Sequence, residues 1–161
     1  MVNGIINTLV AFLMGGATLS FSFTATEGGG AAVSMDGEII TCGQSYRIET
    51  PEFVIAFNGQ ELGVYQKEVD ELVLQPAQNT TQAGNAGIMS NPFALLSNDA
   101  YEAIPSDVDS RGIPASILLK SKTGAKYTIK ILKYASNPVQ EPASFILNPE
   151  NYPTAIVTDL R

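Results

Sequence analysis

The sequence contains no histidine and no tryptophan, and it has a single cysteine, Cys42. Histidine is the commonest general base in enzymes, so its absence excludes Ser–His and Cys–His catalytic pairs. A single cysteine forms no disulfide within the chain, and without histidine it does not complete a typical zinc shell. Glu102, Asp107 and Asp109 lack the glycine and the distal Glu of a calcium loop. We therefore expect no catalytic site, no cofactor and no metal.

Charge is also scarce, and positive charge most of all. Only 16% of the 161 residues are charged, and nine Lys and Arg face sixteen Asp and Glu, for a net charge of −7. Five lysines fall on one expected hairpin and are interpreted as a solvated face: Lys120, Lys122, Lys126, Lys130 and Lys133. This balance argues against a nucleic-acid partner, and its sign argues against attraction to an anionic membrane. The hydrophobic fraction of 45% fits an apolar binding site, or a β-rich protein that uses Ser, Thr, Asn and Gln on its surface.

The first 26 residues carry no charged side chain. No Lys or Arg precedes the apolar run, which argues against a signal peptide, and Gly15–Gly16 breaks a run already too short to span a membrane. Apolar residues at helical spacing predict a helix over 3–14 that ends at these glycines. Residues 17–25 then alternate with a period of two, which predicts a half-buried strand.

Short alternating segments dominate the rest of the sequence. We predict strands over 33–41, 45–49, 53–57, 61–66, 71–75, 117–121, 126–134, 145–147 and 155–158. Residues 76–90 are polar and turn-rich. Asn91 and Pro92 favour the start of a short helix over 91–96. Residues 99–111 are acidic and are expected to be irregular. About ten strands with few helices predict a mostly β, α+β fold whose large antiparallel sheet must curl.

Several of these segments occur in a characteristic order. The strand Ser20–Thr24 is followed by Gly37–Ile40, Tyr46–Pro51, Asn58–Gly59, Val64–Gln66 and Asn91–Leu96, and the tail runs through Phe145–Pro149, Tyr152–Pro153 and Val157–Arg161. In this order and spacing the sequence resembles the LolA-like carriers of outer-membrane lipoproteins. The resemblance covers most of the chain and implies a single domain over 1–161.

The resemblance also implies a fold and a function. The fold is an incomplete β-barrel, a curved antiparallel sheet with an N-terminal helix and a short lid helix. The function is that of a periplasmic carrier that binds lipoprotein acyl chains, or another lipid, and takes them from an inner-membrane lipoprotein-releasing transporter to an outer-membrane receptor. The signal peptide is then expected to have been trimmed. The alternative is a lipid-sensing or protein-interaction module of the same fold.

The lipid-binding cavity that the resemblance implies is apolar and comes from the helix, one face of the sheet and the lid. Its residues are Leu9, Leu13, Phe21, Phe23, Tyr46, Ile48, Phe53, Ile55, Phe57, Phe93 and Leu96. Two departures from the family stand out. The stretch 42–45 lacks the arginine that holds the lid closed in typical members, and Arg47 is expected to point to the face opposite Tyr46. In addition, the acidic residues before Ile117 replace about two strands, which predicts a smaller sheet.

Overall fold

A computed structural model describes residues 2–26, 33–76, 92–97, 100–137 and 141–161. Ten strands in this part of the chain form one sheet. Their bounds are β1 Ala17–Thr26, β2 Val33–Cys42, β3 Ser45–Glu49, β4 Phe53–Phe57, β5 Glu61–Gln66, β6 Glu71–Pro76, β7 Tyr101–Val108, β8 Pro114–Ser121, β9 Lys126–Ser136 and β10 Ile156–Asp159.

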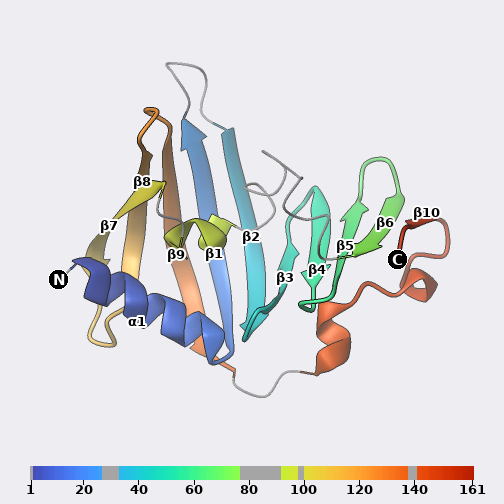
Figure 1. The fold of residues 1–161 in the computed structure, drawn as a ribbon, viewed down its shortest axis with the longest axis horizontal. Helices are drawn as coiled ribbons and strands as arrows, with labels where there is room; N and C mark the ends of the chain where they lie inside the picture. Colours follow the sequence, from blue (N-terminus) through green and yellow to red (C-terminus); the bar gives the residue numbers. More distant parts are fainter. Residues whose placement is uncertain (1, 27–32, 77–91, 98–99, 138–140) are drawn as a thin grey trace.

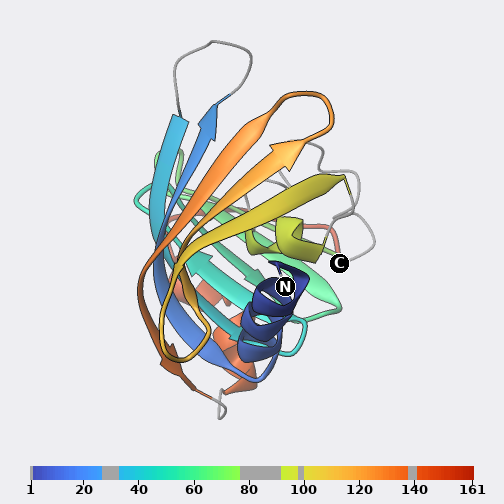
Figure 2. The same cartoon turned by 90° about the vertical axis from the view of Figure 1, so that its left-hand side faces the viewer.

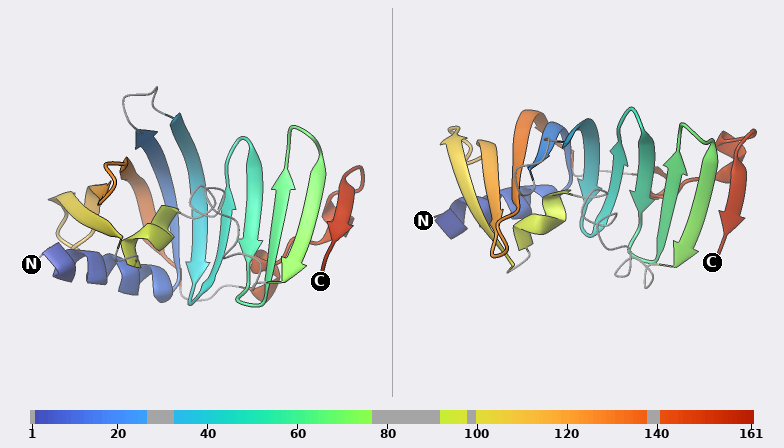
Figure 3. Two further views of the ribbon diagram at one scale, coloured as in Figure 1. Left: turned by 45° about the horizontal axis from the view of Figure 1, so that its top comes forward. Right: turned by 90° about the horizontal axis from the view of Figure 1, so that it is seen from above.

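The strands are joined in the order β10-β6-β5-β4-β3-β2-β1-β9-β8-β7. Every neighbouring pair is antiparallel except β10 and β6, which run parallel. The sheet curls but does not close: β7 lies at one end and β10 at the other (Figures 1 and 3). The predicted fold, a curved sheet that forms an incomplete barrel, is confirmed.

The helix α1 (Val2–Met14) lies on the inner side of the curled sheet (Figure 2). Its apolar stripe is buried, with Ile6, Leu9 and Leu13 all less than a tenth exposed. The helix ends where predicted, and Gly16 there has a φ of 101°, which glycine adopts without strain. The second inner element is the 3₁₀ helix η2 (Pro92–Ser97). The short helix was predicted there, but its proposed cap Asn91 and the polar segment 77–90 lie outside the described residues.

The acidic segment expected to be irregular is in fact the edge strand β7. Tyr101 and Ala103 turn inward and pack against the core, whereas Glu102 and Ser106 are exposed. Acidic residues and Pro105 are tolerated because an edge strand has one side free of ladder hydrogen bonds. The prediction that the acidic segment is irregular was therefore wrong for residues 101–108.

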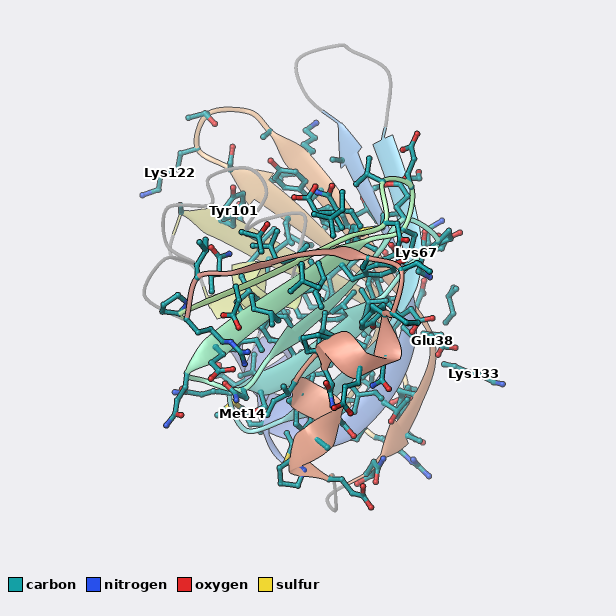
Figure 4. The ribbon with its side chains drawn as sticks, turned by 90° about the vertical axis from the view of Figure 1, so that its right-hand side faces the viewer. Met14, Glu38, Lys67, Tyr101, Lys122 and Lys133 are labelled. Atoms are coloured by element: carbon teal, nitrogen blue, oxygen red, sulfur yellow. The ribbon has the colours of Figure 1, made fainter. Side chains whose placement is uncertain are left out.

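The C-terminal segment packs on the outer face of β4, β5 and β6 and faces the viewer in Figure 4. The strand predicted over 145–147 was wrong: Pro142–Phe145 forms the 3₁₀ helix η3, and a second one, η4, spans Pro149–Asn151. Prolines at the start of each turn disfavour a strand here. Leu147 is 2% exposed and lies over Gly63, where an added Cβ would stand 3.1 Å from its side chain.

Candidate functional site

The inner face of the sheet carries a continuous apolar row across its strands. The register joins Leu19 to Ile39, Ile39 to Ile48, Ile48 to Ile55, and Ile55 to Val64. Because side chains alternate between faces, residues paired directly across neighbouring strands share a face. Five consecutive strands therefore present aliphatic side chains to the interior.

A second row lies one pleat away and is partly aromatic. Thr41 pairs with Tyr46, Tyr46 with Phe57, and Phe57 with Leu62. The rings of Tyr46 and Phe57 have centroids 5.4 Å apart, and both side chains are half-buried. Arg47 pairs with Ala56 on the outer face, as the alternation predicted.

The structure places most of the predicted cavity residues in one core. The buried members of this inner cluster are Leu9, Leu13, Phe21, Phe23, Ile48, Phe93 and Leu96. Tyr46 and Phe53 are half-buried against it. Two predicted residues lie outside that cluster. Ile55 is buried, and the ring of Phe57 lies beside the ring of Tyr46, which packs against the cluster.

Much of the interior is filled by the protein's own side chains. Phe21 and Phe23 have no exposed surface. Phe21 meets Phe93 of η2 edge-on, with ring centroids 5.3 Å apart, and Phe23 stacks on Tyr127 at 5.5 Å. In this arrangement a ligand reaches the half-buried aromatic residues first, and it reaches Phe21 and Phe23 only if neighbouring groups move.

An open pocket of about 130 Å³ lies between the end of α1, the β2–β3 turn and η2. Its lining residues are Val10, Leu13, Met14, Ile39, Thr41, Gly43, Gln44, Ser45, Tyr46 and Phe93. An apolar cavity of about 150 Å³ admits a molecule the size of benzene, and small-molecule pockets commonly span about 300–1,000 Å³. The pocket therefore accepts the end of one alkyl chain, and a longer chain requires α1 or η2 to shift.

Two hydrogen bonds hold the C-terminal end of α1 beside this pocket. The hydroxyl of Thr41 donates a hydrogen bond to the carbonyl oxygen of Leu13 at 2.6 Å. The backbone N–H of Gly43 donates one to the carbonyl oxygen of Met14 at 2.7 Å. The last carbonyls of a helix have no partner within the helix. Gly43 provides the Met14 carbonyl with a partner from the sheet, and Thr41 is a second donor to the Leu13 carbonyl, which also accepts from the N–H of Gly16 at 3.2 Å. Thr41 and Gly43 thus tie the helix to the sheet in a chain without the arginine expected before Tyr46.

Sequence reasoning missed Thr41, although the signal for it was present. Alternation puts Thr41 on the same face as Ile39, and a hydroxyl on an apolar inner face requires a hydrogen-bond partner. The structure shows Thr41 to be 6% exposed with that partner in place.

The β7–β8 turn holds a tyrosine ring of β9 against the last turn of α1. Phe12 meets the ring of Tyr134 edge-on at 5.5 Å, and the Tyr134 hydroxyl donates a hydrogen bond to the carboxylate of Asp109. That bond, assisted by the backbone N–H groups of Ile113 and Arg111, lowers the pKa of Asp109, and the same bond raises the pKa of Tyr134. The carboxylate fixes the ring on which α1 rests.

A second and larger groove opens at the rim formed by the β3–β4 and β5–β6 turns. It has a volume of about 570 Å³ and is lined by Pro51, Glu52, Phe53, Gln66, Lys67, Glu68 and Val69. Phe53 is the single predicted cavity residue in it. Lys67 lies 3.7 Å from Glu49, and both groups are exposed, so this ion pair contributes little stability.

The described residues show no group of three or more Cys, Asp or Glu side chains arranged to hold a metal ion. None of the helices in the same residues has the length and apolar character needed to cross a membrane.

Comparison with known proteins rests on structure. No protein-family model matches the sequence, and no curated protein matches it. A LolA superfamily protein from Nitrosomonas europaea superposes with a TM-score of 0.53 at 10% identity, over 91% of this chain and 97% of that one. The chain has a LolA-like fold. An uncharacterized conserved protein from Thermus thermophilus superposes on this LolA-like chain with a TM-score of 0.55 at 11% identity, over 97% of each chain.

Proposed function

We propose that this LolA-like protein is a periplasmic carrier that binds acyl chains of lipoproteins or of another lipid on the inner face of its sheet. The observation that carries the proposal is the pair of rows on the inner face: one contains the half-buried rings of Tyr46 and Phe57, and Tyr46 lines an open pocket beside the tethered end of α1. Burial of each CH₂ contributes roughly 0.8 kcal/mol, so an acyl chain gains from such a surface without any polar partner.

Carriage also requires release. The pocket admits the end of one acyl chain. When a longer acyl chain enters, contacts that α1 and η2 make with the sheet are replaced by contacts between the ligand and the sheet. Such an exchange keeps the difference in free energy between the closed and loaded forms small. An inner-membrane transporter as donor and an outer-membrane receptor as acceptor belong to this proposal through the family resemblance.

Binding is tested with protein produced in a bacterial periplasm and examined by native mass spectrometry. A second sample is delipidated and titrated with a fluorescent long-chain fatty acid. The wild type should carry lipid and bind the probe, whereas Phe57→Asp should lose both, because it places a carboxylate in the aromatic row. Ile156→Asp is the matched control, since Ile156 is 69% exposed on β10. The proposal would be contradicted if both variants kept binding, and also if both lost it.

The alternative, a lipid-sensing or protein-interaction module, is favoured by the filled part of the interior. Phe21, Phe23, Leu9 and Ile48 are fully buried by the protein's own groups. A protein that leaves the periplasm without lipid, and that binds no fatty acid after delipidation, supports the module over the carrier.

A further inference from the structure

Positive charge in this acidic chain is concentrated in one stretch. Residues 110–140 contain six Lys and Arg and no Asp or Glu, whereas the rest of the chain contains three Lys and Arg and sixteen Asp and Glu. The net charge of −7 is therefore the sum of a charge of +6 in this segment and −13 in the remainder of the chain. The sign of the net charge of the whole chain therefore does not describe the surface that residues 110–140 form.

The fold turns most of this charge outward on the β8–β9 hairpin. Tyr127, Ile129 and Ile131 are buried in the inner cluster, so Lys126 and Lys130 alternate onto the outer face. The pairing of β9 with β1 shifts between Ser20 and Phe21. Lys133 therefore stands opposite Ser20 and also points to the outer face. In Figure 4, Lys133 projects from the side of the molecule opposite Met14 of α1. We name Lys120, Lys126, Lys130 and Lys133 the lysine stripe; Lys122 lies at the hairpin turn.

Hydroxyl residues surround the stripe. Lys130 pairs with Ser116 on β8 and with Ser22 on β1, and the outward residues of β1 are all Ser or Thr. Acidic residues that face the same way begin only on the next strands, with Glu102 on β7 and with Asp36 and Glu38 on β2. Apart from Leu118 and Leu132, the outer face of β1, β8 and β9 thus carries positive and neutral polar groups.

The lysines of the stripe form no ion pair with a carboxylate in the described part of the chain, and Glu102 is the acidic residue that stands directly opposite one of them, Lys120. The ion pairs within the described residues involve no basic residue other than Lys67 and Arg161. Lys120 and Lys126 even stand directly opposite each other, an arrangement that costs stability in a sheet. All four lysines of the stripe are exposed, so each is available to an anion from outside the molecule.

An apolar side chain stands among these lysines. Leu132, in the shifted register between Lys130 and Lys133, is 64% exposed. An anionic lipid surface offers phosphate groups to the lysines and a hydrocarbon boundary to the leucine, whereas a polyanion such as polyglutamate offers the charge alone.

We propose that the outer face of the β8–β9 hairpin docks on anionic phospholipid bilayers. The expectation from the net charge, that an anionic membrane does not attract this protein, fails for this face. The inference rests on the lysine stripe and Leu132 and is independent of acyl-chain binding inside the sheet.

The test is co-sedimentation of the full chain with vesicles of phosphatidylcholine, either alone or mixed with phosphatidylglycerol. We expect binding only to the mixed vesicles and weaker binding as salt is added, because salt screens exposed charges. Each lysine near an anionic surface contributes about 1 kcal/mol, so K126Q/K130Q should weaken binding about thirtyfold. Leu132→Ser should weaken it at every salt concentration, since salt does not screen an apolar contact.

The matched control is R47Q/K67Q, which removes the same charge elsewhere and should leave vesicle binding nearly unchanged. Equal losses in the two double variants would overturn the proposal, because binding would then follow net charge. Absence of binding to the mixed vesicles would also overturn it, as would lysine-dependent binding to polyglutamate without binding to vesicles. Fatty-acid binding measured in parallel should be unchanged in K126Q/K130Q, which separates this test from that of the carrier.

Discussion

The hydroxyl of Thr41 on β2 donates a 2.6 Å hydrogen bond to the carbonyl oxygen of Leu13, in the last turn of α1. The two residues are 28 positions apart in the sequence, and both are less than a tenth exposed. The bond joins the helix to the strand at the mouth of the inner pocket. The carbonyl of Leu13 also accepts a hydrogen bond from the backbone N–H of Gly16 at 3.2 Å, so the bond from Thr41 is its link to the sheet and constrains the position of the helix end.

Replacement of Thr41 by valine, which has nearly the same shape, should therefore loosen the end of α1. We expect the free energy of unfolding to fall by about 1 kcal/mol, the net contribution of a typical buried hydrogen bond. Amide hydrogen exchange should accelerate in the last turn of α1 more than in β4. Thr41→Ser retains the hydroxyl and should keep most of the protection. Equal exchange in Thr41→Val and the wild type would show that the bond does not hold the helix.

The close contact of Gly63 with Leu147 gives a second prediction. An added Cβ at Gly63 meets the Leu147 side chain at 3.1 Å, so Gly63→Ala should overpack the outer cluster and lower the free energy of unfolding by about 1–3 kcal/mol. Gly4→Ala is the control, because nothing lies within 4 Å of its Cβ and alanine favours the helix. In the background of Leu147→Ala the cost of Gly63→Ala should fall in urea denaturation, because the contacts with Cγ and Cδ1 are lost while the contact with Cβ remains. A cost that is undiminished there would assign the effect to the backbone of β5.

The sequence predicted the inner face well because period-two alternation directly determines which residues share a face. The register confirms that Tyr46, Ile48, Ile55 and Phe57 lie on one side. The helix over 3–14 was equally accessible, since its apolar spacing and the glycine pair that ends it are local signals.

The errors have a different origin. Strand β7 was missed because its acidic residues and Pro105 lower local strand propensity, while pairing with β8 and burial of Tyr101 come from distant parts of the chain. Leu147 was expected in a strand because its neighbours are apolar, but Leu147 packs in the outer cluster, over Gly63 of β5, instead. Whether a predicted cavity residue meets ligand depends on packing that local patterns do not encode, as with Phe21 beneath Phe93.

Truncation of Phe93 should separate the two proposed functions. Phe93 lines the pocket and covers Phe21, so Phe93→Ala should enlarge the space while lowering the free energy of unfolding by about 3–5 kcal/mol. For a carrier, fatty-acid affinity should rise because the ligand no longer displaces the ring. The control Phe145→Ala truncates a buried ring in η3, far from the pocket, and should destabilise without raising affinity. A filled module predicts loss of stability in both variants and no binding in either.

Acid should release the C-terminal segment from the sheet edge. Hydrogen bonds from Thr154 and Tyr65, both 2.6 Å, lower the pKa of the Asp70 carboxylate below its usual 3.8. Because the folded-state pKa is the lower one, the stabilisation is present above about pH 4 and is lost as the pH falls through the usual value toward the folded one. The amide of Ile156, which donates to the Asp70 carbonyl, should then exchange faster, as followed by NMR. Asp70→Asn should remove this acid-dependent step, whereas the control Asp36→Asn should leave it intact. A step that survives in Asp70→Asn would belong instead to the neighbouring pair of Asp159 and Arg161, in which the pKa of Asp159 is lowered to about 2.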